Sequence, residues 1–430
     1  MNDLSDRRGD TLRSGASSFG LGSTRLADLW SGGAERVLDR IDARLARGKI
    51  EATLPDGSHR VLGGRAKGFA VKVDLASYRA LLRLATGGSV GWYQAWEAGE
   101  WSSPDPVSLF ALFMDNAVEL SDAARARGPW RLAVKALHAL NRNSRKGARR
   151  NILAHYDLGN DFYGTWLGES MVYSSALFGA HSKRPNRASQ FLSNLDRAQM
   201  VKNAAIGDRL QLRPGQSVLE IGCGWGTLAA YLANALGVDV TAISLSDEQL
   251  AYARRRWQPE NGSVDFLRQD YREVRGQYDA IASVEMVEAV GREYWPAWFD
   301  CLERCLKPGG RAAIQFIAMR EELFDDYARS ADFIQSYIFP GGMLARTKDF
   351  RRLAAERGLE WRDPRWFGGS YARTLKIWRN SFEKAHAEGR LPEGFDQKFV
   401  DLWRYYLMYC EGGFRGKGID VAQVTLVKAG

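Results

Sequence analysis

The chain has 430 residues, of which 45% are hydrophobic, and a formal net charge of +9 at pH 7. This length allows a large buried core divided between two domains. No apolar run reaches the roughly 18 to 20 residues that a membrane span needs, so no transmembrane helix is expected. Four cysteines and five histidines are scattered without the grouping of a metal site, which argues against zinc and favours a reducing cytoplasm.

The amino-terminal region is predicted to contain a tail and a small domain. Residues 1–25 are rich in Ser, Gly, Asp and Arg and lack the apolar core of a signal peptide, which indicates a disordered tail. Residues 26–120 are expected to form a small α+β domain, with a strand near 68–75 and a helix near 75–85. Four aromatic residues then stand close together: Trp92, Tyr93, Trp96 and Trp101. Such density usually indicates a core, and contact with lipid is the alternative.

Residues 121–150 concentrate positive charge. Arg and Lys alternate with apolar residues at near-helical spacing, as in WRLAVKALHAL at 130–140. This pattern fits an amphipathic helix on an anionic membrane surface, and a solvated basic linker is the plainer interpretation. Nucleic-acid binding is disfavoured because no recognisable reading motif is present.

A strand, a glycine turn and a helix follow one another from residue 217. The β-prone run 217–221 is followed by glycines at every second position, Gly222, Gly224 and Gly226. Apolar residues at helical spacing begin after Thr227. Glycines allow close approach of a ligand, and the helix N-terminus offers free N–H groups, although a purely structural turn is the alternative. The pattern resembles the first motif of S-adenosylmethionine-dependent methyltransferases rather than a dinucleotide fingerprint.

Strands and helices alternate through the rest of this region. Helices are predicted at 227–236, ending at Gly237, at 246–257, where Ser246 and Gln249 make a capping box, and at 293–306. The intervening strands are predicted at 238–243, 263–270, 278–284 and 311–317. This alternation predicts a parallel, doubly wound sheet. A helix at 350–358, a strand at 358–367 and a final strand at 421–427 follow. A last antiparallel strand is characteristic of the methyltransferase class, which makes 367–415 an insertion.

Nine ordered motifs resemble the cyclopropane-fatty-acyl-phospholipid synthase family, which includes the mycolic acid cyclopropane synthases. They are HYDLGNDFY, YSSALF, VLEIGCGWG, SLSDEQ, QDYRE, KPGG, YIFPGG, FGGSYARTL and YYLMYCEGGFR. The resemblance covers 151–428 closely, and 26–120 is more loosely similar to the family's lipid-binding domain. It implies an α/β, Rossmann-like class I methyltransferase domain over 151–430, with a seven-stranded sheet and helical insertions. Residues 319–342 and 367–415 could roof an apolar cavity there.

The resemblance also implies S-adenosylmethionine as the cofactor and assigns its contacts. The positions that would close over the cofactor are Tyr156, Tyr173 and Ser174, in the segment ahead of the sheet. The turn under its methionine part would be formed by Gly222, Gly224 and Gly226, and the place of the usual ribose-binding acid is taken by Ser244, Leu245 and Gln249. The contacts to adenine would come from Asp270 and Tyr271. Leu245 and Tyr271 could instead be core residues.

The base of the reaction is where the chain departs from the family, whose members are thought to hold bicarbonate through a Glu, a His, a Cys, a Tyr and a backbone carbonyl. The corresponding positions here are Glu288, Gln315, Ser175, Tyr371 and Ile317, so Gln replaces His and Ser replaces Cys. Ser and Gln can still bind an anion, which leaves a modified bicarbonate site open. Glu285 occupies a position usually held by Gly. It could act as the base itself, stabilise a cation, or be an exposed or capping residue.

Together these features predict a methyltransferase that acts on the double bond of unsaturated phospholipid acyl chains through a carbocation. The product would be a cyclopropane or a methyl-branched chain, and the altered base site favours methylation without ring closure. We expect a cytoplasmic protein, peripheral to the inner face of the membrane, with a homo-oligomer compatible with the resemblance. The alternatives are a small-molecule or RNA methyltransferase on the same core and a non-catalytic lipid-binding protein.

Overall fold

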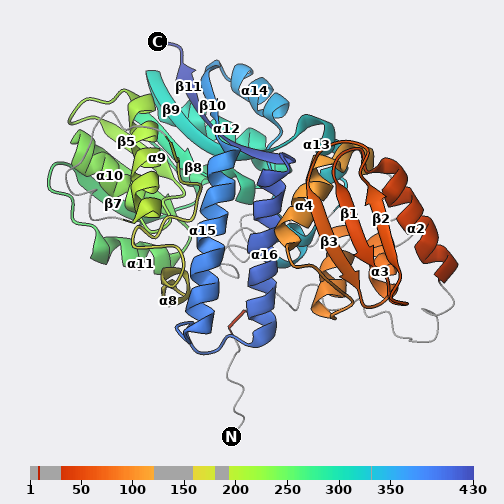
Figure 1. The fold of residues 1–430 in the computed structure, drawn as a ribbon. Coiled ribbons are helices and arrows are strands. Elements are labelled where there is room, and N and C mark those ends of the chain that lie inside the picture. Colours follow the sequence, from red (N-terminus) through yellow and green to blue (C-terminus); the bar gives the residue numbers. More distant parts are fainter. Residues whose placement is uncertain (1–7, 10–30, 121–157, 180–192, 331) are drawn as a thin grey trace, which may run out of the picture. The chain divides into compact units, whose positions relative to one another are not determined.

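The computed structural model describes residues 8–9, 31–120, 158–179, 193–330 and 332–430 (Figure 1). The chain divides into two compact units. Unit 1 contains residues 1–142, 320–340 and 394–419, and unit 2 contains residues 143–319, 341–393 and 420–430. The predicted basic stretch 121–150 and nearly all of the predicted tail lie outside the described residues.

Unit 1 contains a four-stranded sheet with the strand order β2-β1-β3-β4. Its strands are β1 (Lys49–Thr53), β2 (His59–Gly63), β3 (Ala70–Leu75) and β4 (Trp101–Ser102). The side chains of β3 alternate between exposed and buried, as expected for a strand with one face on a core. The helices of this part are α2 (Ser31–Arg44), α3 (Arg79–Glu97), α4 (Pro106–Asp115) and α5 (Ala117–Leu120). The small N-terminal sheet region is therefore confirmed.

Aromatic residues form much of the core of unit 1. Trp92, Tyr93 and Trp101 are buried, and the rings of Trp92 and Trp101 stack 4.4 Å apart. The core interpretation is thus confirmed for these three, whereas Trp96 is partly exposed.

Two segments from later in the sequence also pack in unit 1. They contain α13 (Glu321–Tyr327), a π-helical turn (Ile334–Ile338) and α16 (Gln397–Arg415). The ring of Phe333 lies 4.9 Å from Tyr93 and 4.8 Å from Tyr405. The sequence interpretation had placed these segments with the region 151–430. Their apolar faces are completed instead by aromatic residues of unit 1.

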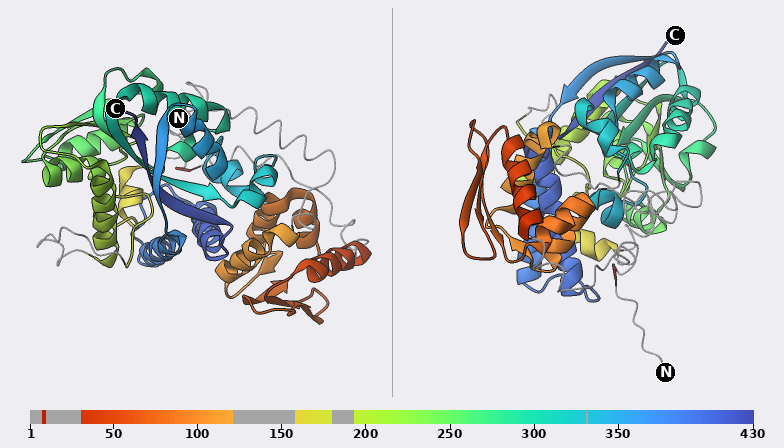
Figure 2. Two further views of the ribbon diagram at one scale, coloured as in Figure 1. Left: turned by 90° about the horizontal axis from the view of Figure 1, so that it is seen from above. Right: turned by 90° about the vertical axis from the view of Figure 1, so that its right-hand side faces the viewer.

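Unit 2 is built on a seven-stranded sheet with the order β10-β11-β9-β8-β5-β6-β7 (Figures 1 and 2). Its strands are β5 (Ser217–Ile221), β6 (Asp239–Ser244), β7 (Ser263–Arg268), β8 (Tyr278–Val284), β9 (Leu306–Met319), β10 (Leu359–Trp366) and β11 (Ile419–Lys428). Strands β5 to β9 pair in parallel, and β11 pairs antiparallel with β10. This arrangement confirms the predicted class I methyltransferase sheet.

The α-helices described in unit 2 are α8 (Asn160–Gly164), α9 (Asn194–Leu210), α10 (Thr227–Leu236), α11 (Asp247–Arg256), α12 (Trp295–Cys305), α14 (Thr347–Ala355) and α15 (Gly368–Ala387). Five of them, α9 to α12 and α14, pack on strands of the sheet. Helix α9 contacts β8, β9 and α10, and α12 contacts β8, β9 and α14. Both helices therefore cover the central strands, whose apolar residues are buried.

The ends of α10 and α11 follow the predicted signals. Helix α10 ends at Gly237 in the left-handed conformation, with φ +65°. Helix α11 begins after Ser246, whose hydroxyl oxygen accepts from the Gln249 backbone N–H at 3.3 Å. The capping box is only half formed, because the Gln249 side chain accepts from Ser244 instead.

Across the described ranges, each helix is too short or too polar to cross a membrane.

Candidate functional site

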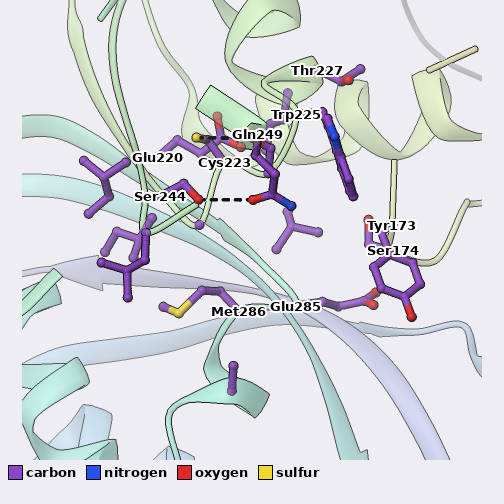
Figure 3. A pocket seen from close by; sticks show the side chains of 18 of the residues that line it. Tyr173, Ser174, Glu220, Cys223, Trp225, Thr227, Ser244, Gln249, Glu285 and Met286 are labelled. Carbon is purple, nitrogen blue, oxygen red and sulfur yellow. Dashed lines mark hydrogen bonds between the residues drawn. The ribbon is translucent and has the colours of Figure 1, made fainter. Parts of the chain in front are cut away.

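A pocket opens at the carboxyl ends of β5, β6 and β8, the edge at which parallel α/β sheets bind ligands (Figure 3). Most of the cofactor residues predicted from the sequence line it: Tyr173, Ser174, Gly222, Gly224, Ser244, Leu245, Gln249, Asp270 and Tyr271. Tyr156 lies outside the described residues, and Gly226 is not part of the lining. The structure therefore brings together segments that are more than 90 residues apart in the sequence.

The glycines of the turn have different roles. Gly224 has φ +52°, and a Cβ added there would meet no atom within 4 Å, so its backbone faces open space in the pocket. A Cβ at Gly226 would instead lie 2.7 Å from the Phe266 ring. Gly226 thus permits close packing at the start of α10, while Gly224 permits a ligand to approach the backbone.

The segment before α9 is tied to this turn. The Trp225 indole N–H donates to Asn160 Oδ1 at 2.7 Å, and the Thr227 hydroxyl donates to the Ser170 carbonyl oxygen at 2.6 Å. Further along, Ser174 receives hydrogen bonds from Gln199 and Lys202 of α9. These bonds hold Tyr173 and Ser174 against the pocket, as a segment that covers a cofactor requires.

Several buried polar groups in the pocket have no hydrogen-bond partner in the described part of the chain. They are both amide atoms of Asn203, Oε2 of Glu220 and the Tyr271 hydroxyl. Leaving such groups unpaired costs free energy, so a polar ligand that pairs with them is favoured. Together with the open backbone at Gly224, they fit S-adenosylmethionine, whose amino acid, ribose and adenine parts all form hydrogen bonds.

Lys202 and Asn203 were not among the predicted site residues. They are adjacent on α9, and both are almost fully buried. Two consecutive polar residues within the helix of a domain core are the only signal that the sequence offered for them.

Buried charges of opposite sign flank the pocket. Burial raises the pKa of Glu220 to about 8 and lowers that of Lys202 to about 8, and in each case the opposite charge acts against the shift. Lys202 Nζ also donates to Ser174 Oγ at 3.1 Å. The charges of Glu285 and Glu220 stabilise the ammonium form of Lys202.

The side of the pocket predicted to bind ribose and adenine is preorganised by hydrogen bonds. The Ser244 hydroxyl donates to Gln249 Oε1 at 3.2 Å (Figure 3). Asp270 forms a salt bridge with Arg272 at 2.5 Å. Tyr271 is buried and also lines the pocket, so it can pack in the core and contact a ligand at the same time.

Glu285 reaches into the pocket from the end of β8 (Figure 3). Its backbone has φ +50°, a left-handed conformation that is uncommon for Glu. Its Oε1 accepts from the Ser175 backbone N–H at 3.0 Å and from Gln315 Nε2 at 2.7 Å. Its Oε2 accepts from the Tyr371 hydroxyl at 2.6 Å. Burial nevertheless raises the pKa of Glu285, against the effect of these donors and of Lys202.

The other predicted catalytic residues lie behind Glu285 or beside it. The side chains of Gln315 and Tyr371 donate to the Glu285 carboxylate. Ser175 donates to this carboxylate with its backbone N–H. The Ser175 hydroxyl donates instead to the Ala176 carbonyl oxygen at 2.9 Å. Glu288 is not in the pocket lining. One of its oxygens accepts from the Ile317 N–H, the other is buried without a partner, and burial raises the pKa of Glu288 to about 8.

Three of the predicted bicarbonate-binding positions thus surround a carboxylate of the protein. Their N–H and O–H donors converge on Glu285 from the covering segment, β9 and α15. Among the described residues, His, Cys, Asp and Glu side chains do not gather in groups of three or more that could hold a metal ion.

The model of the mycolic acid cyclopropane synthetase family matches residues 143–424.

Relatives of known activity cover most of the chain. A tuberculostearic acid methyltransferase of Mycobacterium tuberculosis is 36% identical over 362 residues, which are 81% of this chain and 81% of that protein. The cyclopropane-fatty-acyl-phospholipid synthase of Escherichia coli is 32% identical over 344 residues, which are 80% of this chain and 84% of that protein.

A solved structure of a mycolic acid cyclopropane synthase also resembles this chain. A mycolic acid cyclopropane synthase complexed with SAH and CTAB superposes with a TM-score of 0.58 at 26% identity. The match covers 65% of this chain and 98% of that one.

Proposed function

Since the chain belongs to the mycolic acid cyclopropane synthetase family of S-adenosylmethionine-dependent methyltransferases, we propose that it methylates the double bond of unsaturated acyl chains in membrane phospholipids. The observation that carries this proposal is the carboxylate of Glu285, held in the cofactor pocket by three hydrogen-bond donors. Such a carboxylate is suited to remove a proton from a carbocation.

The reaction needs a methyl donor, an aligned alkene and a base. S-adenosylmethionine supplies the methyl group from its sulfonium sulfur, which keeps the electrons of the broken C–S bond. The π electrons of the alkene form the new C–C bond, and the neighbouring chain carbon is left positively charged. Glu285 stabilises this charge and then takes a proton from the acyl chain or from the new methyl group. The electrons of that C–H bond close a double bond or a ring.

Glu285 would make an external anion unnecessary. The Ser175 N–H, Gln315 and Tyr371 already donate to its two oxygens, so they are occupied by the protein's own carboxylate. We therefore propose that turnover is independent of bicarbonate. Turnover in buffer depleted of carbon dioxide should equal turnover with added bicarbonate, and a strong stimulation by bicarbonate would contradict this assignment.

The product is proposed to be a methylated, unsaturated chain rather than a ring. The support is a carboxylate that is anchored on one side of the pocket in place of a dissolved base, together with the similarity to a protein that is named a tuberculostearic acid methyltransferase and not a cyclopropane synthase. A cyclopropane is the alternative, since the Escherichia coli relative is a cyclopropane synthase.

Deuterium labelling separates these products. Cells with and without the protein are supplied with a precursor of S-adenosylmethionine that carries three deuterium atoms on the methyl group, and their lipids are examined by mass spectrometry. Three deuterium atoms retained on a branched chain would support methylation with proton loss from the acyl chain. Two retained in a saturated ring would overturn it in favour of cyclopropanation.

Access to phospholipid is proposed to occur at an anionic membrane surface. The basic stretch 121–150 supports this, although it lies outside the described residues. Replacing Arg145, Lys146, Arg149 and Arg150 by Gln should weaken sedimentation with anionic vesicles at low salt. Unchanged sedimentation would remove this stretch from membrane binding.

A further inference from the structure

We propose that Gln423 is a positioning residue for Glu285 and that it acts through the side chain of Gln315. The inference rests on the proposed function of Glu285 as the base. It explains a polar residue that the reaction itself does not use, since Gln423 is fully buried within the apolar strand β11.

A line of hydrogen bonds joins Gln423 to the base. Gln423 Nε2 donates to Gln315 Oε1 at 3.0 Å, and Gln315 Nε2 donates to Glu285 Oε1 at 2.7 Å. At the other end, Arg209 Nε donates to Gln423 Oε1 at 3.4 Å. Both amides are buried, so water does not compete for their atoms.

The two ends of this line fix its direction. The Arg209 guanidinium can only donate, so Gln423 must turn its oxygen toward it and its NH2 group toward Gln315. Gln315 must then present its oxygen to Gln423 and its NH2 group to Glu285. The Glu285 carboxylate can only accept, which requires the same orientation from the opposite end. The amide orientations therefore follow from chemistry at both ends and not from shape.

Arg209 is itself well anchored. Its Nη1 donates to the Asp363 carbonyl oxygen at 2.8 Å and to Thr425 Oγ1 at 3.2 Å. Without Gln423, the Gln315 amide would be oriented only by the acceptors around its NH2 group, which are Glu285 Oε1 and, at 3.5 Å, the Ser175 carbonyl oxygen. The Gln315 oxygen would lose its donor, and the amide would be freer to rotate away from Glu285, which weakens the donation to the base.

Other charged and titratable groups also act on Glu285. Tyr371 of α15 donates to it, Lys202 of α9 favours its charged form, and the charge of Glu285 raises the pKa of Glu288 in the turn after β8. Glu220 at the end of β5 interacts with Lys202 in turn. Gln423 differs from all of these because it is neutral and makes no contact with Glu285.

The experiment compares Gln423→Leu, Gln315→Leu, the double variant and Glu285→Gln. Methyl transfer is measured on vesicles of dioleoylphosphatidylglycerol with labelled S-adenosylmethionine. We expect Gln423→Leu to lower kcat about 10- to 100-fold, the range for one hydrogen bond to a charged group, with KM for S-adenosylmethionine unchanged. The acidic limb of its pH–rate profile should move to higher pH, because the charged form of Glu285 loses a donor. In the Gln315→Leu background, Gln423→Leu should have no further effect.

Controls separate positioning from simple loss of packing. Thr425→Val removes another contact of Arg209 on the same strand but leaves both amides intact, so kcat should stay within about twofold. If Gln423→Leu fails to fold, Gln423→Glu takes its place in the experiment. The carboxylate of this variant still accepts from Arg209 but cannot donate to Gln315, so it should show the same loss of kcat.

The outcomes are distinct. Full activity of Glu285→Gln would overturn the proposed function. A defect in Glu285→Gln with normal kcat in Gln423→Leu, or losses that multiply in the double variant, would overturn the positioning role alone.

Discussion

Replacing Glu285 by Gln removes a negative charge from the pocket while keeping the shape of the side chain. The amide oxygen can take the place of Oε1 and accept from the Ser175 N–H at 3.0 Å and Gln315 Nε2 at 2.7 Å. The new NH2 group then faces the Tyr371 hydroxyl, which can accept as well as donate. All three contacts are retained, so the variant should fold normally.

The expected loss lies in catalysis. General bases contribute about 10²- to 10⁴-fold to rate, which corresponds to about 2.7–5.4 kcal/mol of activation free energy. Glu285→Gln should lower kcat by this factor and leave the dissociation constant of S-adenosylmethionine within about threefold. Stability should rise slightly, because a carboxylate whose charge is opposed by burial has been removed.

The assay is single-turnover methyl transfer on dioleoylphosphatidylglycerol vesicles, with cofactor binding followed by calorimetry. Glu356→Gln makes the same chemical change at the C-cap of α14, where the side chain is 47% accessible, and should leave kcat unaltered. A Glu285→Gln variant that keeps kcat within about threefold of the natural protein would refute the role of Glu285 as the base.

Three other perturbations test the electrostatics and shape of the pocket. The base form of Glu285 exists only above its pKa, which burial raises above 4.5, so kcat should fall as pH drops through a value higher than for an ordinary Glu; a pH–rate profile with no acidic limb above 4.5 would contradict this. Lys202→Met removes a positive charge that lowers the pKa of both Glu285 and Glu220, so the acidic limb should move further toward neutral pH. The same variant loses the bond to Ser174, and its KM for S-adenosylmethionine should rise about tenfold; an unaltered profile and KM would make Lys202 a core residue only. Gly224→Val places a branched side chain in open pocket space at φ +52° and should weaken cofactor binding more than about 100-fold at a folding cost of about 1–2 kcal/mol, measured by calorimetry and thermal melting. Normal affinity in that variant would mean that the cofactor does not approach the turn.

The fold of unit 2 was largely predictable because its elements are strongly periodic. The predicted strands 217–221 and 278–284 coincide with β5 and β8, and Ser246 caps the start of α11 as expected. These signals are local: apolar alternation, capping hydroxyls and glycines that end helices. They depend on neighbours within a few residues.

Features set by distant contacts were harder to predict. An apolar helix face does not specify its partner, so the assignment of α16 to unit 1 required the structure. Residue identity likewise does not reveal orientation. Ser175 was expected to offer its hydroxyl to an anion, but it offers its backbone N–H, and Gly226 packs on Phe266 rather than facing the pocket. The position of Glu285 was noted, whereas its three donors could be found only from the folded chain.

The left-handed backbone of Glu285 has an evolutionary consequence. The corresponding position usually holds Gly in the family that the sequence resembles, and Gly adopts φ +50° without the steric cost that Glu bears. The codons of Gly and Glu can differ by a single nucleotide. One mutation at this position can therefore introduce a carboxylate among the donors from Ser175, Gln315 and Tyr371. If Glu285 is the base, as we propose, such a change would tie the base to the chain and free turnover from the supply of inorganic carbon, at the cost of a small backbone strain.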